Sequence, residues 1–212
     1  MEKFLIKGSS SKGVKGLINC SGAKNAVLPL MASSILFDST VTLKNVPLGA
    51  NDVQTMIVLL KSLGSKVQII KKKKILKITN KKKHKLLVKY KYISTMRAGV
   101  LAMGALLGKY SKCSTALSGG CSLGPRPIGY HLAGFKKLNC NYSLNKGYIN
   151  IFSKRGIKGG NYHFPKVSVT GTSNLILASV LAYGVTTLKN ISIEPEVLDL
   201  IKFLKNGGAK IY

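Results

Sequence analysis

Residues 34–46 (SILFDSTVTLKNV) decide the fold, because their pattern returns at residues 179–191 (SVLAYGVTTLKNI). The two segments align without gaps at an offset of 145 residues, and Gly64-Ser65-Lys66-Val67 returns as Gly208-Ala209-Lys210-Ile211 at an offset of 144. An offset of half that length, about 72 residues, leads to a third copy of the pattern in the middle of the chain. A fixed repeat spacing indicates one structural unit used several times, so we predict three units of about 72 residues, at about residues 21–92, 93–165 and 166–212.

Each unit alternates helix and strand signals. Asn51 or Asp52 can cap a helix that Gly64 ends, and Ser94 or Thr95 can cap one that Gly108 ends. In the third unit a helix is expected between the acids and proline of Glu194-Pro195-Glu196 and a closing Gly207. Short β-branched runs lie between the helices, at VTLKNV, YINIF and TTLKNI. The fold class predicted from this pattern is α/β.

The charge pattern leaves two interpretations open. The chain has 34 Lys and Arg against 6 Asp and Glu, a net charge of +28, which suggests a nucleic-acid partner. However, only Arg97, Arg126 and Arg155 are arginines, whereas proteins that bind phosphates or recognise bases favour the bidentate guanidinium group of arginine. The run Lys71–Lys74 follows a short apolar alternation, as expected of a solvated hairpin. A lysine-rich solvated surface is therefore the favoured interpretation over a nucleic-acid face, and we expect any retained arginine to be informative.

Length and cysteine spacing restrict the class of protein further. The longest uncharged apolar run, Ala98–Gly108, is shorter than the roughly 20 residues that a membrane-spanning helix needs. The start MEKFLIKG does not resemble a secretion signal, so we expect a soluble, cytoplasmic protein. The cysteines form no CxxC pair, and this argues against a zinc site and against a disulfide framework. The four are Cys20, Cys113, Cys121 and Cys140.

Two features indicate chemistry at the starts of helices. Lys24 and Arg97 follow small-residue turns, where free N–H groups bind anions and a cation is unfavourable without one. They therefore predict an anion site, unless both side chains simply extend into water. The segment SGGCSLGPRP (118–127) exposes the thiol of Cys121 between glycines, five residues before Arg126. A thiol near cations can donate or accept a proton; a packed cysteine in a turn is the alternative. We expect the other three cysteines to be packing residues.

Five motifs, taken together, resemble those of the UDP-N-acetylglucosamine 1-carboxyvinyltransferases, a family of enolpyruvyl transferases that catalyse the first committed step of peptidoglycan synthesis. The motifs occur in order along the whole chain. The related shikimate-phosphate enolpyruvyl transferases share the repeats but lack the cysteine loop. The five are SGAKNAVLP (21–29), TMRAGVLAMGALLG (95–108), GGCSLGPRPIGYHL (119–132), KVSVTGT (166–172) and EPEVLDLIKFLKNGGAKI (194–211).

The resemblance implies a fold, a reaction and a set of site residues. The fold would be an inside-out α/β barrel of three βαβαββ-type units with pseudo-threefold symmetry. The enolpyruvyl group of phosphoenolpyruvate would pass to the 3-hydroxyl of UDP-N-acetylglucosamine, without metal or organic cofactor. Lys24, Asn25 and Arg126 would hold phosphoenolpyruvate, while Cys121 would act as general acid toward its methylene carbon and be the site of fosfomycin attack. The nucleotide sugar would contact Arg97, Arg126, Pro127, Ile128, Gly129, Tyr130, Lys166, Val167, Ser168 and Val169.

The chain also departs from this family. Gly129-Tyr130 replaces a usual Asp-Leu, Ser173 stands where an acid is frequent, and Ile193 where an Arg is common. Family members are about twice as long and close two three-unit domains over their substrates. Residues 1–20 would then be strands of the other domain, and residues 21–212 one complete domain. The other half would carry the Asp that deprotonates the sugar hydroxyl, together with further arginines.

Two functional hypotheses follow from the sequence. In the first, the chain is an enolpyruvyl transferase whose activity requires a second domain or polypeptide that completes the cleft. In the second, it is a non-catalytic remnant, or a basic module on the same fold that binds polyanions or nucleic acid. Failure to bind nucleic acid at physiological salt would exclude the nucleic-acid form of the second hypothesis.

Overall fold

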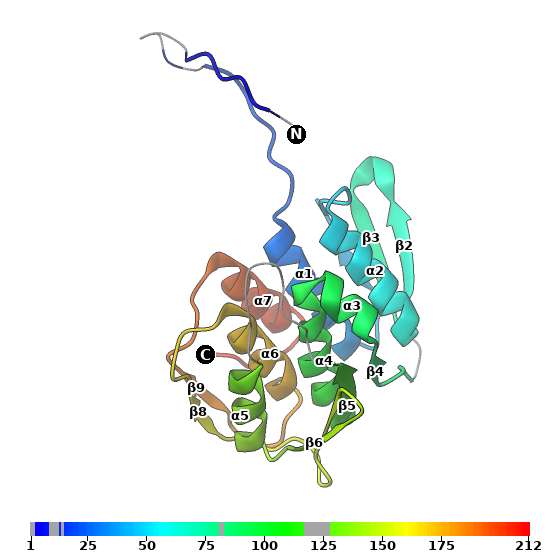
Figure 1. Ribbon diagram of the computed structural model, residues 1–212, viewed down its shortest axis with the longest axis vertical. Helices are drawn as coiled ribbons and strands as arrows, with labels where there is room; N and C mark the ends of the chain where they lie inside the picture. Colours follow the sequence, from blue (N-terminus) through cyan, green and yellow to red (C-terminus); the bar gives the residue numbers. More distant parts are fainter. Residues whose placement is uncertain (1–2, 9–12, 14, 81–82, 117–127) are drawn as a thin grey trace.

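A central group of helices is surrounded by three small sheets (Figure 1). The computed structural model describes residues 3–8, 13, 15–80, 83–116 and 128–212. Three inner helices lie at the centre, and the other helices pack around them. The inner helices are α1 (Lys24–Ser33), α4 (Leu101–Tyr110), which follows the 3-10 turn η3 (Arg97–Val100), and α6 (Val169–Ser179). The other helical elements are η1 (Ser34–Leu36), α2 (Asn51–Leu63), η2 (Lys71–Lys73), α3 (Tyr90–Thr95), α5 (Gly129–Lys137) and α7 (Pro195–Asn206).

The strands form three sheets, and each sheet contains all or part of the same arrangement of strands. Sheet 2 is the fullest: β4 pairs in parallel with β5, and β5 pairs antiparallel with β7 of the hairpin β6–β7. Sheet 1 holds β1 and the hairpin β2–β3, with β3 antiparallel to both neighbours. Sheet 3 holds the parallel pair β8 and β9. The strands are β1 (Val41–Leu43), β2 (Lys66–Ile70), β3 (Ile75–Thr79), β4 (Leu87–Val88), β5 (Lys112–Ala116), β6 (Asn141–Asn145), β7 (Tyr148–Phe152), β8 (Asn161–His163) and β9 (Thr187–Lys189).

These elements confirm the predicted α/β class. The chain from β4 to β7 alternates as βαβαββ, and the other two sheets carry parts of that pattern in the described residues. β4 and β8 join the sheets of the units that follow them in sequence. The closed barrel with threefold symmetry stays a prediction, as do the domain limits at residues 20 and 21. No helix in the described part of the chain is long and apolar enough to cross a membrane.

Helix α2 shows how the local sequence specifies an outer element. Val53, Met56 and Leu60 recur at helical spacing on one face and are buried. The acidic Asp52 lies in its first turn and the basic Lys61 in its last, where each sign of charge suits the helix dipole. Gly64 ends the helix in the left-handed conformation (φ 116°), as its sequence predicts.

Inner helices α4 and α6 pack unusually closely because small residues face one another. A Cβ on Gly104 would overlap the side-chain amide and main-chain carbonyl of Asn174, and one on Gly108 would crowd the carbonyl of Leu177. Asn174 accepts a hydrogen bond from the Gly104 N–H (2.7 Å) and donates one to the Val100 carbonyl (3.0 Å). The predicted helix end at Gly108 was therefore wrong, because this glycine permits close packing and α4 continues to Tyr110.

A buried polar network joins sheet 1 to helix α4 through His84. The imidazole Nδ1 lies 2.6 Å from the Tyr110 hydroxyl, and Nε2 lies 3.1 Å from Ser65 Oγ and 3.2 Å from Asn80 Oδ1. Burial, and secondarily the positive charge of Lys109, lower the pKa of His84. The folded protein therefore favours the neutral imidazole.

We expect this network to make stability fall with acidification. The unfolded chain binds a proton at His84 near pH 6.5, whereas the folded chain takes it up only at lower pH. The free energy of unfolding should therefore decrease as pH falls below about 6.5, by at most about 1.4 kcal/mol per pH unit from this group. Urea denaturation from pH 7.5 to pH 5.5 measures the slope. His84→Gln should flatten it, while the exposed His163→Gln should not; equal slopes in all three proteins would contradict the assignment.

The N-terminal segment leads away from the body of the molecule (Figure 1). Described residues 15–20 are extended and make no strand pairing, and Leu17 is 91% exposed. Cys20 is exposed as well, so the expectation that it packs in a core was wrong. The apolar residues around it have no packing surface within the described chain.

Candidate active site

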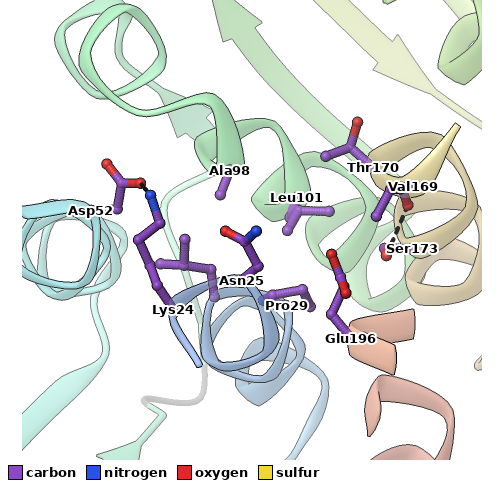
Figure 2. Close-up of a pocket in the computed structure, with 11 residues that line it drawn as sticks. Lys24, Asn25, Pro29, Asp52, Ala98, Leu101, Val169, Thr170, Ser173 and Glu196 are labelled. Carbon is purple, nitrogen blue, oxygen red and sulfur yellow. Dashed lines mark hydrogen bonds and ion pairs between the residues drawn. The ribbon is translucent and has the colours of Figure 1, made fainter. Parts of the chain in front are cut away.

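A cavity of about 410 Å³ opens where the first turns of the three inner helices meet. Figure 2 shows how the side chains of several helical elements are arranged around it. The inner helices supply most of the wall, and α2 and α7 each add one carboxylate from the first turn. The lining residues are Lys24, Asn25, Leu28, Pro29, Asp52, Ala98, Leu101, Val169, Thr170, Ser173 and Glu196.

The start of α1 supplies free hydrogen-bond donors to this cavity. Its N-cap residue is Ala23, and within the described residues no side chain caps the helix. The first main-chain N–H groups after a cap have no partner inside a helix, so they attract an anion together with the positive end of the helix dipole. Lys24 and Asn25, the first two helical residues, line the cavity.

Lys24 is held by an ion pair at one side of the cavity. Its ammonium lies 2.8 Å from a carboxylate oxygen of Asp52, and the two side chains are 47% and 32% exposed (Figure 2). An ion pair this exposed adds little to stability, about 0–1 kcal/mol. It can therefore open at small cost when an anion enters, while it keeps the ammonium at the cavity until then.

The two carboxylates are site residues that the sequence reasoning did not identify. Asp52 and Glu196 occupy the same position in α2 and α7 and are related by the repeat offset of 144 residues. That offset was the available signal, but the sequence pattern indicated Asp52 only as a possible helix cap and Glu196 only as a first-turn dipole partner. The cap prediction was wrong, because Ala50 is the N-cap of α2. With one cation and two acids, the described lining is not cationic by itself. Polyanion binding here would need further positive charge from outside this set.

Helix α6 presents hydroxyl groups to the other side of the cavity. Ser168 caps this helix by accepting a hydrogen bond from the Gly171 N–H (3.1 Å), so its hydroxyl already has a structural role. The Ser173 hydroxyl donates to the Val169 carbonyl (3.0 Å). Thr170 lies between them on the cavity wall. Val169 stands where α1 has Lys24, so the third unit contributes no cation at this position.

The structure brings together some of the residues named from sequence. Lys24, Asn25 and Val169 line the cavity, and Arg97 begins η3 beside Ala98. Lys166 and Val167 are exposed just before α6, whereas Ile128, Gly129 and Tyr130 lie at the start of α5 and outside the cavity lining. Cys121, Arg126 and Pro127 lie outside the described residues. Among those described, no three His, Cys, Asp or Glu side chains are grouped to hold a metal ion.

Cys113 and Cys140 are buried packing residues, as predicted. Burial raises the pKa of the Cys113 thiol, with a further contribution from Cys140, and raises the pKa of Cys140 to about 12. A thiol with such a pKa is protonated at neutral pH and is a poor nucleophile. Neither residue is a candidate for acid–base or nucleophilic chemistry.

Thiol labelling should separate these cysteines by reactivity. With iodoacetamide at pH 7.5, we expect the exposed Cys20 to be alkylated at least a hundredfold faster than Cys113 and Cys140, since both buried thiols are protonated and inaccessible. Peptide mass spectrometry over time gives the rate at each site. Comparable rates for Cys20 and Cys140 in the folded protein would contradict the described packing, and labelling in urea should remove the difference.

Comparison of the sequence with known proteins identifies a family and named relatives. The family model of EPSP synthase (3-phosphoshikimate 1-carboxyvinyltransferase) matches residues 9–212. Relatives named UDP-N-acetylglucosamine 1-carboxyvinyltransferase include those of Pelagibacter ubique, 44% identical, and Magnetococcus marinus, 42% identical, each aligned over 211 residues. Each alignment covers 100% of this chain and 49% of the relative. The chain thus spans about half the length of the curated relatives it matches.

Solved structures share the fold. The enolpyruvyl transferase NikO from Streptomyces tendae superposes with a TM-score of 0.79 at 13% identity, covering 93% of this chain and 46% of that one. EPSP synthase from Acinetobacter baumannii superposes with a TM-score of 0.63 at 17% identity, covering 86% and 42% respectively. At these identities the likeness shows the fold alone.

Proposed function

The chain belongs to the EPSP synthase family of enolpyruvyl transferases, and on that premise we propose that it forms one domain of a UDP-N-acetylglucosamine 1-carboxyvinyltransferase. The observation that carries the proposal is the cavity at the start of α1, lined by Lys24 and Asn25. The relatives at 42–44% identity with that name support the choice of substrate pair. In this function the chain takes part in the first committed step of peptidoglycan synthesis, in the cytoplasm.

The proposed reaction is an addition followed by an elimination. The 3-hydroxyl oxygen of the sugar forms a bond to C2 of phosphoenolpyruvate, while the methylene carbon takes a proton. The resulting adduct then loses a proton from that carbon as the C2–O bond to phosphate breaks, which restores the C2–C3 double bond as an enol ether of the sugar and releases phosphate. Cys121 would donate the first proton, and the hydroxyl proton would pass to a base in the second domain.

Lys24 and the N–H groups of α1 would hold the phosphoenolpyruvate anion. Donors that are fixed before the reaction stabilise charge in a cavity that excludes water, without reorganising as the charge develops. Asn25 adds a neutral amide beside them. Arg126 would contact the phosphate, and Arg97 with the segment Lys166–Val169 would face the nucleotide sugar.

The charge of the described cavity explains why a second domain would be required. Phosphoenolpyruvate is a polyanion, yet Asp52 and Glu196 outnumber Lys24 in the described lining. Additional cations must therefore close over the substrate, from Arg97, from Arg126 and from the half that this chain does not span. The partner we propose is a domain or polypeptide with the sequence of the second half of the relatives.

Reconstitution tests the proposed function. The chain would be mixed with the second half of the Pelagibacter ubique relative, and phosphate release from phosphoenolpyruvate would be followed with and without UDP-N-acetylglucosamine. We expect release only when both halves and both substrates are present, and loss of it in Cys121→Ser. No release from the mixture, or release that Cys121→Ser leaves unchanged, would refute the proposal. Binding of duplex DNA at physiological salt by an inactive mixture would favour the basic-module hypothesis instead.

A further inference from the structure

The lysines of this chain are concentrated in one region instead of being spread evenly. Of its 31 lysines, 13 lie in residues 61–91, and residues 53–193 contain no Asp or Glu. The hairpin β2–β3 of sheet 1, with its turn η2, lies within that region. We propose that this hairpin docks the protein reversibly on the surface of an anionic phospholipid bilayer. Such docking would be a second property of the chain, beside the proposed reaction.

The repeat supplies an internal comparison for this hairpin. β3 pairs antiparallel with β1 in sheet 1, just as β7 pairs antiparallel with β5 in sheet 2, so the hairpins β2–β3 and β6–β7 are equivalent. Residues 66–79 carry six lysines, whereas residues 141–152 carry only Lys146. The two hairpins share one fold and one chain, so neither the fold nor a chain-wide preference for lysine explains the difference. The lysines of sheet 1 therefore need an explanation of their own.

Sheet 1 turns one face toward the core and the other, here called the outer face, toward solvent. Leu76 and Ile78 of β3 are buried, whereas Lys77 between them is exposed, because successive side chains of a strand point to opposite faces. The outer face carries amines and neutral polar groups but no carboxylate in the three strands. Its exposed residues there are Thr42, Lys66, Gln68, Lys77 and Thr79.

Four consecutive lysines form the tip of the hairpin. Lys71–Lys73 make the turn η2, Lys74 follows in the left-handed conformation (φ 50°), and all four side chains are exposed. In the described part of the chain, the two ion pairs join Lys24 and Lys109 to acids outside this hairpin, so no carboxylate neutralises the tip. Like charges this close repel one another, and a negatively charged surface that approaches them relieves the repulsion.

An apolar pair adjoins these charges on the outer face. Ile70 and Ile75 stand opposite each other as the last pair of β2 and β3 before the tip. They alternate in step with Gln68 and Lys77, so they belong to the outer face, and both are only half-buried. Figure 1 shows the hairpin at the outer edge of the molecule, where a flat surface can approach it. Basic groups beside accessible apolar side chains are typical of segments that bind the headgroup region of a bilayer.

The chemistry of sheet 1 favours lipid headgroups over nucleic acid. Residues 41–80 contain no arginine and no Phe, Tyr or Trp. Proteins that bind single strands stack bases on aromatic rings, and those that recognise bases in a duplex commonly use arginine. A lysine ammonium acts as a point charge with little geometric demand, which suits a fluid layer of phosphate groups. Each lysine near an anionic bilayer strengthens binding about fivefold.

Vesicle binding tests the docking face without any catalytic readout. The full chain would be sedimented with phosphatidylcholine vesicles that contain about one third phosphatidylglycerol, in about 0.15 M salt. Replacing all four lysines of the tip, Lys71–Lys74, by glutamine should reduce the partition coefficient at least tenfold. The matched control loses the same charge at exposed lysines outside sheet 1 and should bind within about threefold of the parent chain, because distant charges are screened. Its substitutions are Lys137→Gln, Lys154→Gln, Lys202→Gln and Lys205→Gln.

A tryptophan reporter tests whether the apolar pair enters the headgroup region. The chain contains no Trp, so an introduced indole is the only source of tryptophan emission. In Ile70→Trp we expect the emission to shift to shorter wavelength when anionic vesicles are added, because the indole leaves water. Leu144→Trp places the same reporter at an exposed position of the equivalent hairpin β6–β7, and its emission should not shift. The shift should reverse in about 1 M salt, where the Debye length falls from about 8 Å to about 3 Å.

Other results would overturn the proposal. Equal partition of the tip variant and its control would mean that total charge, and not this hairpin, drives binding. An unshifted emission of Ile70→Trp in the vesicle-bound chain would exclude contact of the outer face with lipid. Tip-dependent binding of a single-stranded oligonucleotide, by a chain that does not bind the vesicles, would assign the hairpin to nucleic acid. Loss of vesicle binding when the second half of the Pelagibacter ubique relative is added would assign this face to the contact between the two halves.

Discussion

Lys24→Met is expected to reduce phosphate release by the reconstituted enzyme about 10²–10³-fold in kcat/KM, the usual effect of removing one preorganised charge-stabilising donor. Lys24 is the one cation that lines the described cavity, and it lies beside the uncapped start of α1. Its loss also leaves Asp52 and Glu196 uncompensated, which repels an anionic substrate. Steady-state kinetics with phosphoenolpyruvate as the varied substrate measure the effect.

Two comparisons separate this loss of activity from a loss of structure. The ion pair of Lys24 with Asp52 is partly exposed, so its removal should change stability by less than about 1 kcal/mol and leave Tm nearly unchanged. Lys202→Met removes an exposed lysine from α7, outside the cavity, and should leave activity unaltered. An active Lys24→Met variant would show that the cavity at α1 is not the phosphoenolpyruvate site.

Gly104→Ala is expected to destabilise the fold by about 3 kcal/mol and to lower Tm by roughly 6–12 °C. The added Cβ would overlap the side-chain and main-chain oxygens of Asn174, so α4 and α6 would have to move apart. Separation would also weaken the hydrogen bond from the Gly104 N–H to Asn174. These losses exceed the gain of about 1 kcal/mol that alanine brings to a helix interior.

Gly129→Ala is the matched control for this variant. Gly129 begins α5, and no atom lies within 4 Å of a Cβ placed there. We expect its Tm to equal or slightly exceed that of the parent chain. Thermal unfolding followed by circular dichroism compares the two variants. A Gly104→Ala protein as stable as the Gly129→Ala protein would contradict the close packing of α4 and α6.

Local sequence signals predicted the elements better than their packing. The hairpin around Lys71–Lys74 and the helix ends at Gly64 and Gly207 follow from residue chemistry within a few positions, and the structure confirms them. The packing role of Gly108 and the exposure of Cys20 depend on segments distant in sequence. The local sequence around an apolar or small residue does not show whether another segment covers it. Neither the packing role of Gly108 nor the exposure of Cys20 could therefore be predicted from neighbouring residues.

The candidate site shows the same division. A small-residue turn before Lys24 and Asn25 was enough to predict an anion site at the start of α1, and both residues line the cavity. The carboxylates of Asp52 and Glu196 were missed as site residues, because acids in a first turn already have a local explanation. Only the convergence of six helical elements brings these side chains to one cavity. The roles of Cys121 and Arg126 stay predictions, since both lie outside the described residues.

The central claim is that this chain supplies one half of an active enolpyruvyl transferase. Mass spectrometry of the sugar nucleotide tests it most directly, after incubation of the chain and the second half of the Pelagibacter ubique relative with both substrates. We expect UDP-N-acetylglucosamine to gain one enolpyruvyl group only when both polypeptides are present, and not with Lys24→Met or Cys121→Ser. Unmodified UDP-N-acetylglucosamine from a mixture in which the two halves associate would contradict it.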